Sequence, residues 1–196
     1  MPTGVHLRDV RRQLFDAAER VLLRDGPSGL TSRAVTTEAG CAKGVLHRHF
    51  ADFDAFLAEF VLDRAQALEA RTRTLRESAG TGSVVDNVTA TLTALLGPVP
   101  MAIIPLVTFR DGLRARLRDA RPGGGVAILG DATTAVADYL TDEQARGRLA
   151  ADADIPSLTL SLVGGSHLLT TDSAAPPTTD AVHRLVTTVL APAVRH

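Results

Sequence analysis

The sequence has one cysteine, Cys41, so one chain cannot form an internal disulfide or a zinc site built from several cysteines. No stretch approaches the run of about 18 apolar residues that a membrane-spanning helix needs. The N-terminus also lacks the apolar core of a signal peptide. From these absences we expect a cytoplasmic protein without a membrane segment.

Aromatic residues and lysine are also scarce. There is no tryptophan, and after Phe60 the only aromatic residues are Phe109 and Tyr139. Aromatic cages for flat cations are therefore hard to build in this part of the chain. Lys43 is the single lysine, and the other cationic side chains that stay charged at all physiological pH values are arginines.

The formal charge is −1 overall, but it is unevenly distributed. Residues 1–50 have eight Lys and Arg against five Asp and Glu, a net charge of +3. Residues 51–196 have thirteen against seventeen, a net charge of −4. The split favours a nucleic-acid-binding module on a mildly acidic body, although +3 alone also suits an ordinary soluble protein.

Apolar spacing predicts three helices in the basic segment. The first covers residues 7–25 and ends at Gly26-Pro27, because proline cannot continue a helix. Thr31 or Ser32 caps a short helix that ends near Gly40, and a third follows over about 42–50. Two short helices joined by a tight turn containing glycine are typical of a helix-turn-helix.

The remaining chain is predicted to be helical too. Asp52 is a candidate N-cap for a long helix. The alternation of apolar and polar residues over 158–162 is typical of a strand, but no second strand is predicted to pair with it. We therefore expect an all-α fold, with a helix-turn-helix head over 1–51 and a larger helical body over 52–196. The predicted body helices cover 52–77, 85–96, 101–119, 126–144, 154–169 and 179–194.

Several residues in segment 30–50 agree in register with a known motif. They include Ala39-Gly40, Lys43-Gly44 and Leu46 followed by His49-Phe50. With Leu14 to Ala18 before it, this segment resembles the tetracycline-repressor (TetR) family of transcriptional regulators over roughly residues 10–60. The resemblance implies a dimeric DNA-binding regulator, most often a repressor, whose two heads read an inverted-repeat operator.

The second helix of a helix-turn-helix lies in the major groove, and its N-terminal residues reach base edges. Lys43 and Arg48 can neutralise phosphates or contact guanine, and Gly44 permits a close approach to DNA. The resemblance assigns backbone contacts to Thr31 and His49, and base reading to 42–47. The predicted DNA-binding residues are Thr31, Ser32, Arg33, Ala42, Lys43, Gly44, His47, Arg48 and His49.

Three positions depart from the family pattern. His47 stands where the family usually has tyrosine, and Ala42 where it has serine or threonine. Phe53 replaces a residue that is commonly basic. Each departure removes a possible phosphate contact, so we expect fewer contacts than in a typical member.

The resemblance also implies a homodimer in which the last two helices, 154–169 and 179–194, pack as a four-helix bundle. The alternative is that the apolar stripe of the last helix is internal core, in which case the dimer uses another face. The predicted dimerisation residues are Leu158, Leu162, Gly165, Leu169, Val182, Leu185, Val186 and Val189.

TetR-like regulators release DNA when a small molecule binds the body, so the resemblance implies an effector. The aliphatic composition favours an apolar or amphipathic molecule. The candidate lining residues, each equally suited to core packing, are Phe60, Met101, Ile104, Phe109 and Tyr139. We expect no cofactor and no metal, since His47 and His49 are two residues apart and point to different sides of a helix.

Two alternatives remain open at this point. One is a head that binds DNA weakly while the body acts through a protein partner. The other is a helical enzyme or small-molecule carrier with a degenerate head. Ser166-His167 lacks the Gly-x-Ser-x-Gly turn of a nucleophilic serine, so we expect no enzyme.

Overall fold

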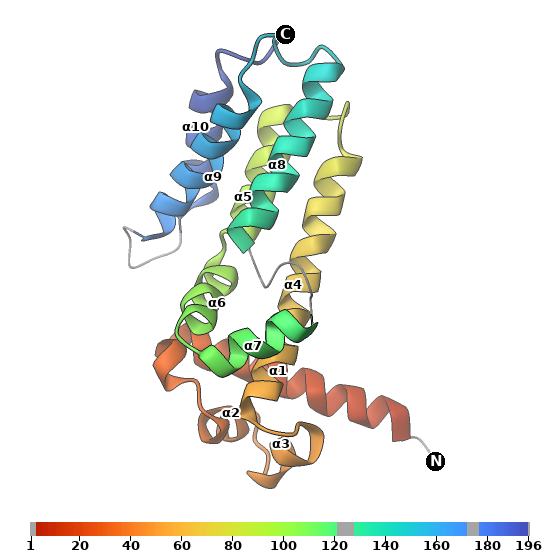
Figure 1. Cartoon of the computed structure of the whole chain (residues 1–196), viewed down its shortest axis with the longest axis vertical. Coiled ribbons are helices and arrows are strands. Elements are labelled where there is room, and N and C mark those ends of the chain that lie inside the picture. Colours follow the sequence, from red (N-terminus) through yellow and green to blue (C-terminus); the bar gives the residue numbers. More distant parts are fainter. Residues whose placement is uncertain (1–2, 121–127, 172–176, 196) are drawn as a thin grey trace. The chain divides into compact units, whose positions relative to one another are not determined.

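The computed structural model describes residues 3–120, 128–171 and 177–195, and their side chains over 10–120, 130–170 and 177–195. The regular elements in these ranges are helices, which confirms the all-α prediction (Figure 1). They are α1 (Thr3–Gly29), α2 (Ser32–Glu38), α3 (Gly44–His49), α4 (Phe53–Glu77), α5 (Val84–Leu95), α6 (Pro98–Thr108), α7 (Asp111–Ala120), α8 (Ile128–Ala145), α9 (Ile155–Thr171) and α10 (Thr179–Leu190).

The helices divide between two compact units that are not continuous in sequence. Unit 1 comprises residues 1–64 and 98–126, and unit 2 comprises 65–97 and 127–196. The chain therefore leaves unit 1 within α4 and returns to it at α6. The functional boundary at residue 51 stays a prediction.

Unit 1 is built around an aromatic cluster. The ring of Phe15 on α1 lies 6.0 Å from Phe50, 5.7 Å from Phe56 and 6.1 Å from Phe60, measured between ring centroids. Phe50 follows α3 directly, and Phe56 and Phe60 belong to α4. The cluster thus fixes the end of α3 and the start of α4 on the same helix, α1.

Helix α1 is interrupted where the sequence predicts its end. Gly26 has φ 70° and ψ −178°, which is not helical, and Pro27 follows it. The chain then makes one further short turn to Gly29. The predicted N-cap of α4 is confirmed, because Asp52 Oδ1 accepts a hydrogen bond of 2.8 Å from the backbone N–H of Ala55.

The prediction of a single helix over 101–119 is wrong, because the chain breaks between α6 and α7. Pro105 does not cause the break, since the N–H of Phe109 still donates to its carbonyl at 3.0 Å. Arg114 on α7 bridges the break, because its Nη1 donates a hydrogen bond of 2.6 Å to the carbonyl of Thr108 at the end of α6. Asp111 then opens α7, where a carboxylate suits the positive end of the helix dipole.

In unit 2, α8 packs against α5 and α9, and α10 packs against α5 and α9. The alternating stretch 158–162 lies inside α9, so the prediction of a helix there is confirmed. The last helix ends at Leu190 instead of 194, since Pro192 has no N–H to donate. Val194 instead forms an isolated antiparallel bridge with Leu149.

Within the described ranges, no single helix combines the length and apolar composition needed to cross a membrane. The bent pair α5 and α6 meets that test only when the two helices are counted together.

Candidate nucleic-acid interface

Helix α2 begins at a capping threonine. Thr31 has an extended backbone, and its Oγ1 accepts a hydrogen bond of 3.1 Å from the N–H of Ala34. The helix is fixed in unit 1 by Val35, which is fully buried. The hydroxyl of Thr31 is exposed and still has its own O–H to donate, which suits a phosphate oxygen.

A tight turn joins α2 to α3. Gly40 has φ 65°, a backbone conformation that side chains with a Cβ rarely adopt. The N–H of Cys41 donates to the carbonyl of Thr36 at 3.0 Å, and Gln13 Nε2 donates to the carbonyl of Ala39 at 2.8 Å. Burial raises the pKa of the Cys41 thiol, so it stays protonated near neutral pH and behaves as a small apolar residue.

Helix α3 turns one side to the core and another to solvent. Leu46 is fully buried, whereas Lys43, Gly44, His47 and Arg48 are exposed. Residues four apart lie on the same face of a helix. Lys43 is therefore next to His47 on the surface, and Gly44 is next to Arg48. A Cβ built on Gly44 meets no atom within 4 Å, so this surface is open.

The remaining predicted contact residues lie close to this surface in sequence and differ in exposure. Ala42 and Arg33 are exposed, and Ser32 is half-buried. His49 is half-buried, and its carbonyl accepts a 3.4 Å hydrogen bond from Arg11 Nη1.

The cations of unit 1 fall into two groups that the sequence alone does not distinguish. One group is neutralised by carboxylates: Arg20 and Arg24 both bind Glu38, at 2.8 and 2.7 Å. The hydrogen bonds from Arg24 and Arg20 hold the pKa of Glu38 below its usual value. By contrast, Lys43 and Arg48 form no ion pair within the described part of the chain, so their charge is available to a partner.

The candidate effector-lining residues have very different surroundings. Phe60 belongs to the aromatic cluster of unit 1 and is fully buried, and Met101 and Ile104 on α6 are half-buried. Phe109 is 83% exposed, and its assignment to the effector site stays a prediction. It lies directly after the end of α6. It borders an open hollow of about 310 Å³ together with Pro27 and Leu30.

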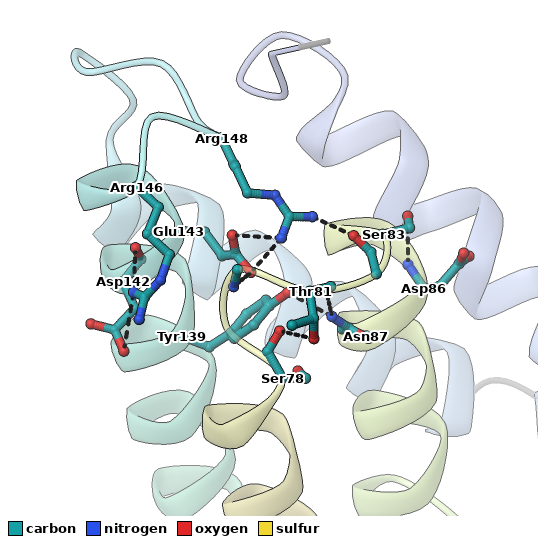
Figure 2. A network of polar contacts seen from close by, with 12 residues as sticks. Ser78, Thr81, Ser83, Asp86, Asn87, Tyr139, Asp142, Glu143, Arg146 and Arg148 are labelled. Atoms are coloured by element: carbon teal, nitrogen blue, oxygen red, sulfur yellow. Dashed lines mark hydrogen bonds and ion pairs between the residues drawn. The ribbon is translucent and has the colours of Figure 1, made fainter.

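Tyr139, the fifth candidate, belongs to a polar network in unit 2 (Figure 2). Its hydroxyl accepts a hydrogen bond of 3.0 Å from Asn87 Nδ2, which also donates to the carbonyl of Thr81 at 3.0 Å. Burial raises the pKa of Tyr139 to about 12.

Glu143, next to it, is fully buried. One oxygen accepts from the N–H of Gly80 at 3.0 Å, and the other lies 3.3 Å from Arg148 Nη1. These contacts fasten the loop between α4 and α5 to the end of α8.

The predicted dimerisation residues also divide into two groups. Leu162, Val182 and Val186 are buried within one chain, so the prediction that they face a partner is wrong. The internal-core alternative applies to them, because α9 and α10 pack against each other and their neighbours. The residues that remain half-buried are Leu158, Gly165, Leu169, Leu185 and Val189.

The sequence analysis missed two exposed leucines on α9. Leu160 and Leu168 are 71% and 66% exposed, and Gly164 lies midway between them, with open space where a Cβ would be. Gly165, by contrast, faces α10, since a Cβ there would lie 3.1 Å from Leu185 Cδ2. Leu160, Gly164 and Leu168 are spaced four residues apart, so they lie on one outward face of α9.

Comparisons with known proteins agree with this arrangement. Residues 14–60 match the family model described as bacterial regulatory proteins, tetR family. No curated protein matches the chain in sequence.

Three solved structures illustrate the likeness in fold. A transcriptional regulator of the TetR family from Agrobacterium tumefaciens has a TM-score of 0.72 at 13% identity, covering 96% of this chain and all of the other. A protein from Saccharomonospora viridis, described as a transcriptional regulator in complex with choline, has a TM-score of 0.70 at 16% identity with the same coverage. The multidrug binding protein EbrR, complexed with imidazole, has a TM-score of 0.54 at 19% identity, covering 91% and 93%.

At these identities the three structures show a shared fold alone, and the family match is confined to residues 14–60. Those residues contain α2, α3 and the start of α4, the segment whose exposed side chains are described above. The N-terminal segment, residues 14–60, therefore matches the tetR family of bacterial regulatory proteins.

Proposed function

We propose that this transcriptional regulator is a repressor that binds an inverted-repeat operator as a homodimer. The observation that carries the proposal is the exposed face of α3, where Lys43 and Arg48 have no carboxylate partner in the described residues. Two cations without partners beside an open glycine suit a phosphate backbone, and the same face offers His47 to the bases.

The dimer is proposed to form through α9. Leu160, Gly164 and Leu168 make an apolar outward face on which another helix can pack closely. Of the residues predicted from sequence, Leu158 and Val189 line an open hollow of about 560 Å³ beside it.

The effector is proposed to be a small apolar or amphipathic molecule that binds among the middle helices and releases DNA. Two half-buried aliphatic side chains, Met101 and Ile104, support this class of ligand. The structures solved with choline and with imidazole show that this fold binds small molecules in those proteins. An effector releases DNA only if it binds the DNA-incompetent conformation more tightly than the competent one.

The proposal is tested by selecting bound fragments from random double-stranded DNA at two salt concentrations and sequencing them. We expect an enriched inverted repeat whose half-sites lie about 34–36 Å apart, with weaker enrichment at the higher salt. Absence of enrichment at both salt concentrations, with a correctly folded dimer, contradicts the proposal. Enrichment of a single half-site would support sequence-specific DNA binding but would contradict the proposed homodimer.

A further inference from the structure

Arg116 on α7 and Arg110, which immediately precedes this helix, contact the residues following α3. Asp52, the N-cap of α4, comes three residues after His49 and forms an ion pair with Arg116 through its Oδ2. Asp54 lies 3.8 Å from Nη1 of Arg110, measured from its Oδ1. All of these residues belong to unit 1.

The packing holds α7 close to this part of α4. The guanidinium of Arg110 lies 5.4 Å from the centre of the Phe53 ring. Gly112 approaches Asp54 so closely that an added Cβ would lie 2.5 Å from Oδ2 of the carboxylate. A side chain at this position would displace the Asp54 carboxylate, so the backbone at the start of α7 packs directly against that side chain.

The two aspartates lie in an unfavourable place for a DNA-binding protein. Three residues span at most about 11 Å between Cα atoms, so Asp52 lies at a separation comparable to the Debye length in 0.1 M salt from His49, a predicted phosphate contact. Its side chain is 49% exposed, and Phe53 beside it supplies no positive charge. Without compensation, both carboxylates would repel the DNA backbone.

We propose that α7, together with Arg110 immediately before it, is part of the DNA-binding surface, where Arg116 and Arg110 neutralise Asp52 and Asp54 beside the reading helix. The proposal rests on the proposed DNA binding of α3 and extends it to a helix about sixty residues further along the chain. Arg116 is 44% exposed in its side chain, so its guanidinium also remains accessible to a phosphate.

The pairs contribute little to folding, since exposed ion pairs stabilise proteins only slightly. Their effect is therefore expected in DNA binding. Arg116→Ala leaves Asp52 uncompensated in both half-sites of the dimer and should weaken operator binding about tenfold in 0.1 M salt. Asp52→Asn should bind at least as tightly as the wild type, because asparagine keeps the cap and loses the charge.

The experiment measures the dissociation constant for the selected operator at several salt concentrations, with thermal unfolding to verify each fold. Arg118→Ala is the matched control, because Arg118 is exposed on the same helix and forms no ion pair in the described part of the chain. We expect Arg118→Ala to change binding less than twofold, which sets a net-charge baseline. The double variant Asp52→Asn with Arg116→Ala should recover most of the loss.

Equal losses for Arg116→Ala and Arg118→Ala would overturn this inference, since only net charge would then matter. Failure of Asp52→Asn to rescue Arg116→Ala would overturn it as well, because the arginine would then act on something other than the carboxylate. In both cases the wild type still binds its operator and the proposed function stands. A wild type that binds no DNA would overturn both proposals.

Discussion

Lys43 and Arg48 are exposed and form no ion pair within the described part of the chain. Replacing either with alanine removes one cation from the exposed face of α3 without disturbing buried Leu46. Operator affinity should fall, and the slope of log K against log salt should flatten by about two units for a dimer that loses one phosphate contact per half-site.

The control for these variants is Arg73→Ala. Arg73 is exposed on α4 in unit 2 and forms no ion pair within the described ranges. The assignment of both residues to DNA is refuted if their salt slopes equal those of the wild type and of Arg73→Ala.

Tyr139 permits a test of the buried network, because it is the only tyrosine and there is no tryptophan. The ultraviolet absorbance of tyrosinate should therefore titrate near pH 12 in the folded protein, against about 10 in the unfolded chain. A pKa raised by folding gives stability that is full below pH 10 and is lost as the pH rises toward 12. Tyr139→Phe should remove that pH dependence, and titration near pH 10 in the native state would show that the ring is accessible.

At the level of elements, local signals predict helix ends well. Gly26-Pro27 and the Asp52 cap act through their own backbone and nearest neighbours, so the sequence identifies them. The break between α6 and α7 is different, because it depends on Arg114 reaching the carbonyl of Thr108 and on α7 meeting Asp54. Those contacts are tertiary, so the apolar periodicity of residues 101–119 does not predict them.

Gly26 and Gly44 make a matched pair for testing backbone constraint. A Cβ at either position meets no atom, but only Gly26 has a positive φ. Gly26→Ala should lower the free energy of unfolding by about 1–3 kcal/mol, because φ 70° with ψ −178° is a backbone conformation essentially restricted to glycine. Gly44→Ala, on α3, should leave stability unchanged or slightly raised while weakening DNA binding. Chemical denaturation measures both, and equal effects would show that backbone conformation at Gly26 is not the constraint.

For the whole molecule, the sequence distinguishes exposed from buried residues better in α3 than in the last two helices. The α3 residues can be predicted because the motif fixes their register. The apolar residues of the last two helices cannot be sorted by periodicity alone. Val182 and Val186 form internal core, whereas Leu160 and Leu168 face outward, and both kinds recur at helical spacing. Which stripe a neighbouring helix covers depends on how the helices pack.

The proposed dimer gives a prediction at the same scale. Leu168→Asp places a charge on the exposed face of α9, so it should produce folded monomers in sedimentation experiments. Val186→Asp, at a fully buried position, should instead prevent folding. A Leu168→Asp protein of unchanged dimer mass would locate the interface on another face.

Unit 1 is built from two separate stretches of the sequence. This arrangement limits how recombination can exchange DNA-binding heads between such proteins. Unit 1 takes α6 and α7 from residues 98–126, and their side chains Leu106 and Leu113 are buried. A gene fusion with one junction, placed at residue 51 or 64, would transplant the reading helix but leave these two helices behind. Recombination that preserves the module intact needs three crossovers, after residues 64, 97 and 126. DNA specificity in this architecture should therefore change by substitutions on α3 more readily than by shuffling of whole heads.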